Sequence, residues 1–109
     1  MEDRVEISLL MDLYNPLLTE KQKNIMELYY NDDLSLAEIA ELNNTSRQAI
    51  HDLIKRCYKQ ILSYEDKLNL LKKSLEKEAC IDSLLNDMMN KYSVKEKDLE
   101  EYKEILLNL

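Results

Sequence analysis

One stretch of the chain, from Leu18 to Leu62, restricts the fold more than any other feature. It contains the segment LTEKQKNIMELYY and then LSLAEIAELNNTSRQAIHDLIKR, a short helical pattern joined to a longer one by a polar corner. Numbered from Leu36, the small residue Ala40 takes the fifth position and Asn44 the ninth. Helices that cross at about 90–120° leave room only for a small residue where they touch. A tight corner also needs a residue that tolerates positive φ, as Asn does.

The inner face of the longer helix follows the same spacing. Ile50 and Leu53, at the fifteenth and eighteenth positions, turn that face onto the preceding helix. Ser35 with Glu38 forms a capping-box pattern for the first helix of the pair, and the cap of the second is either Thr45 or Ser46. This stretch therefore predicts a helix-turn-helix.

The composition favours an all-α fold. The 109 residues include no glycine and one proline, so hairpin turns with positive φ at both central residues are hard to build. Phosphate-binding glycine loops and dinucleotide fingerprints are excluded, because their turns require glycine. The alternation of β-branched and aromatic residues expected of strands is missing. A chain of this length supports one helical core and not two ample domains.

Further helices are predicted on both sides of the motif. Residues 2–14 form an apolar first helix, which Asn15-Pro16 ends. Thr19 with Gln22 forms a capping box for a helix that runs to about Tyr30.

After the corner, apolar positions recur with four-three spacing, which predicts one long helix packed lengthwise on another. That partner is either the chain's own tail or a second copy, and Ser63 with Asp66 marks an alternative break. The positions are Ile50, Ile54, Cys57, Ile61, Tyr64, Leu68, Leu71 and Leu75.

A new apolar stripe begins at Ile81, and Ser93 with Glu96 predicts a capping box for a last amphipathic helix. We therefore expect a helix-turn-helix domain over residues 1–62. We expect residues 63–109 to form a helical extension that packs on that domain or forms a dimer seam.

Metal, catalytic and membrane functions find little support. Cys57 and Cys80 lie on apolar faces without a second cysteine or histidine at ligand spacing, so we expect small, reduced core residues and no metal. The single histidine, His51, belongs to no catalytic cluster, so we expect no enzyme and no cofactor. We see no signal peptide and no long apolar span, and we expect a cytoplasmic protein that does not bind membranes.

The charge distribution bears on whether the protein can bind nucleic acid. A net charge of −7 opposes DNA as a whole. Within residues 45–62, however, four basic residues face one acidic residue, Asp52. Positive charge is therefore local, at the helix that would meet phosphates.

The second helix of a helix-turn-helix enters the major groove with its N-terminal end leading. Its outward positions predict contacts to base edges, and positions further along predict contacts to phosphates. The alternative is an ordinary solvated face, on which Asp52 pairs with Lys55 or Arg56. The predicted base-facing residues are Ser46, Arg47, Gln48 and His51, and the predicted phosphate-facing residues are Lys55, Arg56 and Lys59.

These segments resemble region 4 of bacterial sigma factors, the part that reads the promoter −35 element. The whole chain resembles the small bacterial YlxM-like helix-turn-helix proteins, most specifically in SRQAI and the isoleucine stripe that follows it. The resemblance implies that Ser46, Arg47 and Gln48 open the recognition helix, with Lys55-Arg56 following. The chain departs from the pattern at Asn43, where an apolar residue is usual, and we expect Leu42 to fill that place.

Two functional hypotheses follow. The first is a DNA-binding regulatory protein, a homodimer if its operator is palindromic; the resemblance implies a connection with the signal recognition particle pathway. The second is a protein- or RNA-binding adaptor that uses the acidic, apolar-striped tail.

Overall fold

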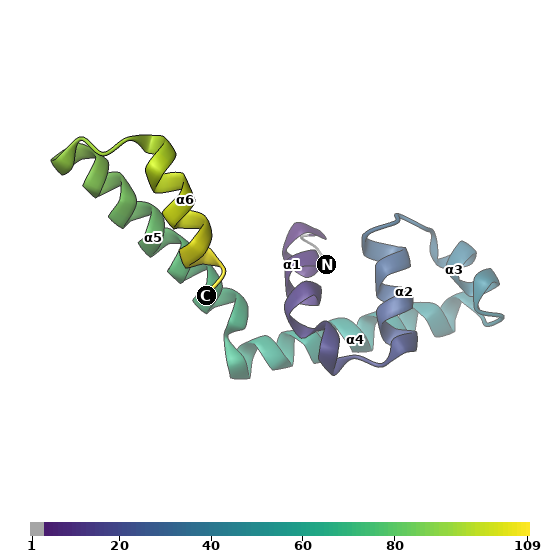
Figure 1. The fold of residues 1–109 in the computed structure, drawn as a ribbon. Coiled ribbons are helices and arrows are strands. Elements are labelled where there is room, and N and C mark those ends of the chain that lie inside the picture. Colours follow the sequence, from purple (N-terminus) through teal and green to yellow (C-terminus); the bar gives the residue numbers. More distant parts are fainter. Residues whose placement is uncertain (1–3) are drawn as a thin grey trace. The chain divides into compact units, whose positions relative to one another are not determined.

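The computed structural model describes residues 4–109, which form helices and contain no strand (Figure 1). The prediction of an all-α fold is confirmed. The predicted start of the first helix lies outside the described residues. Within these residues, no helix combines the length and apolar character that a membrane crossing requires. The elements are α1 (Arg4–Tyr14), the 3-10 turn η1 (Asn15–Leu17), α2 (Glu20–Tyr30), α3 (Leu36–Leu42), α4 (Arg47–Leu68), α5 (Leu70–Tyr92) and α6 (Glu96–Leu107).

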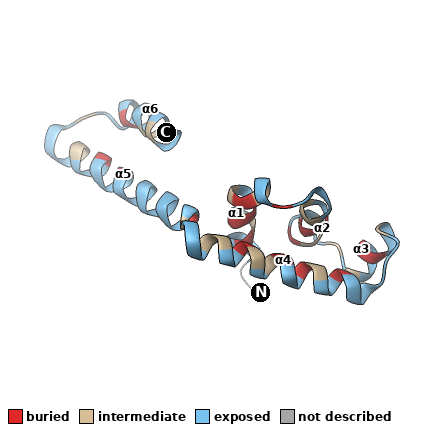
Figure 2. Cartoon of the chain, turned by 90° about the horizontal axis from the view of Figure 1, so that it is seen from below, coloured by how far each residue is buried: buried red, intermediate tan, exposed pale blue. Residues whose placement is uncertain are grey.

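The chain divides into two compact units, Met1–Leu71 and Lys72–Leu109. In the first unit, α1, α2 and α3 all pack on α4. Figure 2 shows the buried faces of these helices in red. The first half of the predicted heptad stripe is therefore used inside the chain, as the face of α4 that the other three helices cover. Its buried members are Ile50, Ile54, Cys57 and Ile61.

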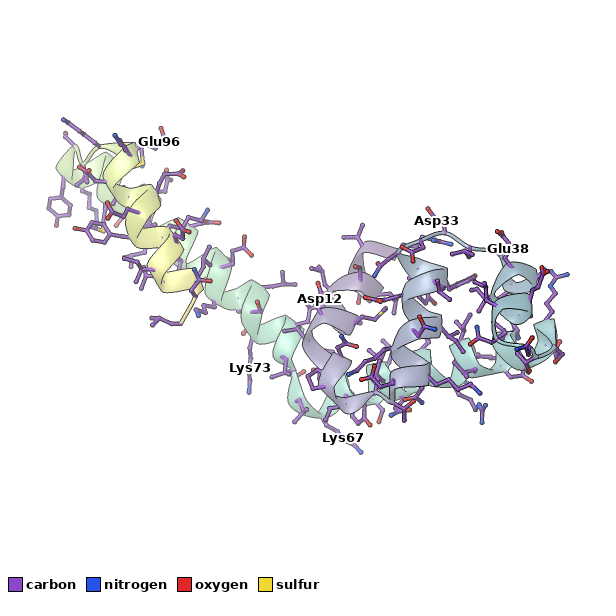
Figure 3. All side chains as sticks on the ribbon, turned by 45° about the vertical axis from the view of Figure 1, so that its right-hand side comes forward. Asp12, Asp33, Glu38, Lys67, Lys73 and Glu96 are labelled. Carbon is purple, nitrogen blue, oxygen red and sulfur yellow. The ribbon has the colours of Figure 1, made fainter. Side chains whose placement is uncertain are left out.

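Two of the predicted capping boxes start helices of this unit. The hydroxyl of Thr19 accepts a hydrogen bond from the backbone N–H of Gln22, whose side chain accepts one from the N–H of Thr19. Ser35 and Glu38 form the same reciprocal pair at the start of α3. Both predictions are confirmed, and each box satisfies two donors that a helix start leaves unpaired. Figure 3 labels Glu38 on α3 and Asp33 in the loop before it.

The predicted long helix does not continue to Leu75. It ends at Leu68, because Asn69 adopts a left-handed conformation with φ 54°. A new helix, α5, then begins. Leu68 and Leu75 are 45% and 52% exposed, whereas Leu71 belongs to the core of the first unit, so the second half of the stripe is only partly buried. The break lies past Ser63 and Asp66, where the sequence marked an alternative one.

A buried tyrosine holds this break in place. The hydroxyl of Tyr14 donates to Glu65 Oε1 at 2.5 Å and accepts from the N–H of Leu70 at 3.2 Å. Glu65 Oε1 also accepts from the N–H of Leu71 at 3.0 Å. Two donors at the start of α5 are thus satisfied by groups from α1 and α4. Burial and the hydrogen bond to Glu65 raise the pKa of Tyr14.

The second unit is a pair of helices, namely α5 from Lys72 onward and the whole of α6. Its small core contains Ile81, Leu85 and Leu99. Lys103 on α6 lies 2.7 Å from a carboxylate oxygen of Asp82 on α5, and this hydrogen bond raises the pKa of Lys103.

Two predictions for this unit are wrong. Ser93 has a φ of 52°, and α6 starts at Lys95 as N-cap without a side-chain hydrogen bond, so no capping box forms with Glu96. Cys80 is exposed, whereas Cys57 in the first unit is buried as expected. Cys80 directly precedes Ile81, a member of this core, but successive helical residues point about 100° apart, so its side chain does not share the buried face.

Candidate nucleic-acid interface

The corner between α3 and α4 has the backbone that the motif requires. Asn44 has a φ of 52°, as its position in the motif predicts. The N–H of Thr45 donates to the carbonyl of Ala40 at 3.0 Å, which closes the turn over a buried alanine. The chain therefore leaves α3 and enters α4 through a single left-handed residue.

The expectation for Leu42 is wrong, since its side chain is 63% exposed. Asn43, the residue that departs from the usual apolar pattern, fills the corner in another way. Its side-chain amide donates to the carbonyl of Ile39 at 2.8 Å, at a half-buried position. A polar side chain is tolerated there because its amide finds an acceptor in a carbonyl that also accepts the backbone N–H of Asn43.

Of the two predicted caps for α4, the structure uses Ser46. Its backbone is extended, and its hydroxyl oxygen accepts from the N–H of Ala49 at 3.0 Å. This leaves the hydroxyl hydrogen as a donor for an outside acceptor.

All seven predicted contact residues are exposed, including those of the first turn of α4. These residues are Ser46, Arg47, Gln48, His51, Lys55, Arg56 and Lys59. Gln48, His51, Lys55, Arg56 and Lys59 lie outside the buried stripe of α4, whereas Ser46 and Arg47 are exposed at the start of the helix.

The structure brings five of these residues together. Two hollows adjoin along α4, with Leu36 of α3 and His51 as shared lining. Arg47 and Gln48 complete the lining of one hollow, and Lys55 and Lys59 belong to the other. Ser46 and Arg56 line neither hollow, and Nε of Arg56 donates instead to the backbone carbonyl of Asp52 at 3.4 Å.

The expected pairing of Asp52 with Lys55 or Arg56 is wrong. Its carboxylate accepts from the side-chain amide of Gln48 at 3.0 Å and lies 3.6 Å from Nδ1 of His51. The i,i+4 geometry of the helix allows this contact as readily as a pairing with Arg56. Gln48 would have to exchange Asp52 for a base edge to read DNA.

The electrostatics of the hollows favour an anion. Neither of them is lined by an Asp or Glu side chain. Among the residues that the structure describes, Lys55 and Lys59 form no ion pair. Their charge is therefore not neutralised within the protein.

The sequence reasoning missed the apolar part of this surface. Tyr29, Tyr58 and Leu62 line the hollow that contains Lys55 and Lys59. The signal was present, because Tyr58 and Leu62 follow Ile54 of the buried stripe at intervals of four residues and extend the apolar surface beside it. The four-three pattern drew attention to the buried stripe alone.

The comparisons with known proteins agree with this geometry. A family model described as "Putative helix-turn-helix protein, YlxM / p13 like" matches residues 1–105. A UPF0122 protein of Clostridium botulinum is 70% identical over 109 residues, which cover the whole of both chains. A UPF0122 protein of Clostridium perfringens is 59% identical over 102 residues, 94% of this chain and 90% of that relative. A UPF0122 protein of Clostridium kluyveri is 55% identical over 94 residues, 80% of this chain and 85% of that relative.

Proposed function

The chain belongs to the YlxM/p13-like family of helix-turn-helix proteins, and on that premise we propose that it binds double-stranded DNA through α4 as a regulatory protein. One observation carries this proposal. After the corner at Asn44, a row of basic and polar side chains on α4 is exposed to solvent. A recognition helix requires this placement, because its first turns must reach base edges in the major groove.

The side chains divide into two roles. Arg47 and Gln48 have the donor geometry for guanine and adenine edges, and Ser46 and His51 stand beside them in the first two turns. Lys55, Arg56 and Lys59 lie further along α4, where cations contact phosphates and set the register of the protein on the duplex. No catalytic role is proposed.

Fluorescence anisotropy with duplexes selected from a random pool tests these roles. Arg47→Ala should weaken binding to the selected duplex by about 1–3 kcal/mol and relax the base preference at one position of the site. Lys55→Ala should weaken binding to all duplexes alike. Lys73→Ala, an exposed change on α5, serves as the control and should alter neither property. Equal effects of Arg47→Ala and Lys55→Ala on every duplex would contradict the assignment, and absence of binding at low salt would refute the proposal.

A palindromic site among the selected duplexes would require two copies of the chain. A homodimer would present its two recognition helices about 34 Å apart, one turn of the duplex. Analytical ultracentrifugation of the protein with such a duplex should find two chains per site. One chain per palindromic site would exclude the homodimer.

The connection with the signal recognition particle pathway and the cytoplasmic location remain proposals, supported by the family resemblance. Purification of the tagged protein from its own cells should recover the particle's protein or its receptor if the connection is physical. Recovery of DNA without either protein would limit the role to DNA.

A second candidate function is that of a protein-binding adaptor. Its support is the second unit, where Leu84, Tyr102 and Ile105 are exposed beside many acidic residues. Purification of the wild-type protein and of Ile105→Asp tests it, since a partner that docks on α6 should be lost from the variant. Recovery of nucleic acid alone from both proteins would remove this candidate.

A further inference from the structure

A pocket of about 430 Å³ lies beside the exposed row of α4, where that helix faces residues of α2 and α3. Its lining is mainly apolar, and Ile54, at 2% exposure, joins it to the core of the first unit. Small-molecule sites in proteins usually have volumes of about 300–1,000 Å³ and an apolar lining with a few polar groups. The apolar lining residues are Tyr29, Leu36, Ile54, Tyr58 and Leu62.

Arg4 and Tyr30 contact Tyr29, which forms one wall of this pocket. The guanidinium of Arg4 lies 5.4 Å from the centre of the Tyr29 ring and donates to the carbonyl of Tyr29 at 3.2 Å. Arg4 also pairs with Asp33. The ring of Tyr30 meets that of Tyr29 edge to face, with centroids 4.9 Å apart. The Tyr29 ring is thus positioned before a ligand arrives, which lowers the entropic cost of binding.

The polar part of the lining carries one sign of charge. Its charged members are Lys55 and Lys59, with the imidazole of His51 beside them, and no carboxylate lines the pocket. In a chain with a net charge of −7, two lysines without acidic partners next to an apolar surface are complementary to a ligand of opposite charge. Cations at the edge of an apolar pocket fix the orientation of such a ligand.

We propose that this pocket binds a small organic anion with an apolar ring system, such as an aromatic carboxylate or sulfonate. The ring system packs between Tyr29 and Tyr58 over Ile54, and the anionic group lies at Lys55 and Lys59. A phosphate backbone alone would leave the apolar lining unused, and an uncharged ring would leave the lysines without a partner.

A regulatory consequence rests on the proposed function. Lys55, Lys59 and His51 line the pocket and also belong to the predicted DNA surface. A bound anion would neutralise charges that DNA needs, so the anion and the duplex would weaken each other's binding by the same factor. The pocket would then be the effector site of a DNA-binding regulator.

Anilinonaphthalene sulfonate is a suitable probe, because its fluorescence rises in apolar sites, and N-phenylnaphthylamine is its uncharged counterpart. With the full-length protein, the sulfonate should bind about tenfold more tightly than the amine, a difference that corresponds to about 1.4 kcal/mol. Equal affinities would overturn the proposal, because the lysines would then contribute nothing.

Two double variants with the same change in charge locate the site. Lys55→Glu with Lys59→Glu should weaken sulfonate binding by at least about tenfold. Lys73→Glu with Lys77→Glu, two exposed positions on α5, should change it by less than about twofold. Lys73 extends from α5 into solvent in Figure 3. Amide chemical shifts of Tyr29, Ile54 and Tyr58 should move with the sulfonate, and shifts confined to residues 72–109 would overturn the proposal.

Two further measurements separate the remaining explanations. Sulfonate affinity that falls as protein concentration rises would overturn the proposal, since a second copy would then occupy the pocket. If the sulfonate binds as expected but the protein binds no duplex, the pocket stands and the proposed DNA function fails. If a duplex binds and the sulfonate does not, the pocket fails and the DNA function stands. If both bind without weakening each other, the regulatory consequence fails.

Discussion

Asn44 shows how the conformation of one residue determines the arrangement of two helices. The chain has no glycine, so its left-handed positions must be taken by other residues. The described residues with positive φ are Asp33, Asn44, Asn69 and Ser93. All have short polar side chains, and Asn and Asp tolerate this region better than most other non-glycine residues.

Substitutions at Asn44 should therefore separate conformation from side chain. Asn44→Gly keeps the positive φ at no steric cost, whereas Asn44→Ala places a Cβ in the left-handed region. We expect the alanine variant to be less stable than the glycine variant by about 1–2 kcal/mol in urea unfolding. Equal stabilities would mean that the corner can adopt another backbone conformation.

The ionisation of Tyr30 should make the stability of the fold depend on pH in the alkaline range. Burial raises its pKa from 10.0 to about 12 in the folded protein. Folding therefore favours the protonated phenol, and this contribution is complete below pH 10 and is lost as the pH rises from 10 to 12.

Tyr30→Phe should reduce the loss of unfolding free energy over that range, as measured by urea titrations at successive pH values. Tyr102→Phe, at an exposed position, provides the matched control and should leave the slope unchanged. Burial raises the pKa of Cys57 from 9.0 to about 11. Its contribution to the pH dependence of stability is the same in the wild type and in both variants. A wild-type slope in Tyr30→Phe would contradict the prediction.

At the level of the helices, one sequence pattern has two outcomes. Ser35 and Glu38 form a capping box, while Ser93 and Glu96, with the same spacing, do not. The difference lies in the backbone, because Ser35 is extended and Ser93 has a positive φ. A capping box needs an extended N-cap residue, and the turn geometry decides whether that residue is the serine.

Alanine substitutions should distinguish the two serines. Ser35→Ala removes an acceptor for the start of α3 and should lower the stability of the first unit by about 1 kcal/mol. Ser93→Ala removes no cap and should change stability by less than about 0.5 kcal/mol. Hydrogen exchange of the amides at the starts of α3 and α6 measures both effects locally. Similar losses of protection at the two starts would show that Ser93 caps α6 in solution.

At the level of the whole molecule, the net charge of −7 sets the electrostatic conditions for any contact with DNA. The proposed phosphate contacts come from three side chains of α4, Lys55, Arg56 and Lys59. Each phosphate that a protein neutralises contributes about −0.9 to the slope of log K against log salt. One chain should therefore give a slope of about −3.

Anisotropy titrations at several salt concentrations test this prediction. Lys55→Ala should reduce the magnitude of the slope by about 1, and Lys73→Ala should leave it unchanged. A slope that alanine substitution of Lys55, Arg56 and Lys59 leaves unaltered would place the phosphate contacts elsewhere on the chain.

Most of the first unit could be read from local patterns. The apolar spacing, the two capping boxes and the proline after α1 act over a few residues, so they predicted α1 to α4 and the left-handed corner. The exposed row of α4 follows from the same periodicity. Its use in DNA contact stays a prediction.

Features that depend on distant residues could not be read in this way. The end of α4 at Asn69 is stabilised by Tyr14, which lies far away in the sequence and becomes a neighbour only after α1 packs on α4. The pocket behind Lys55 likewise combines Tyr29, Leu36 and Tyr58 from three helices. Local sequence thus determined the helices and the corner, whereas packing decided where α4 ends and which exposed side chains share a surface, because those outcomes depend on contacts between separate helices.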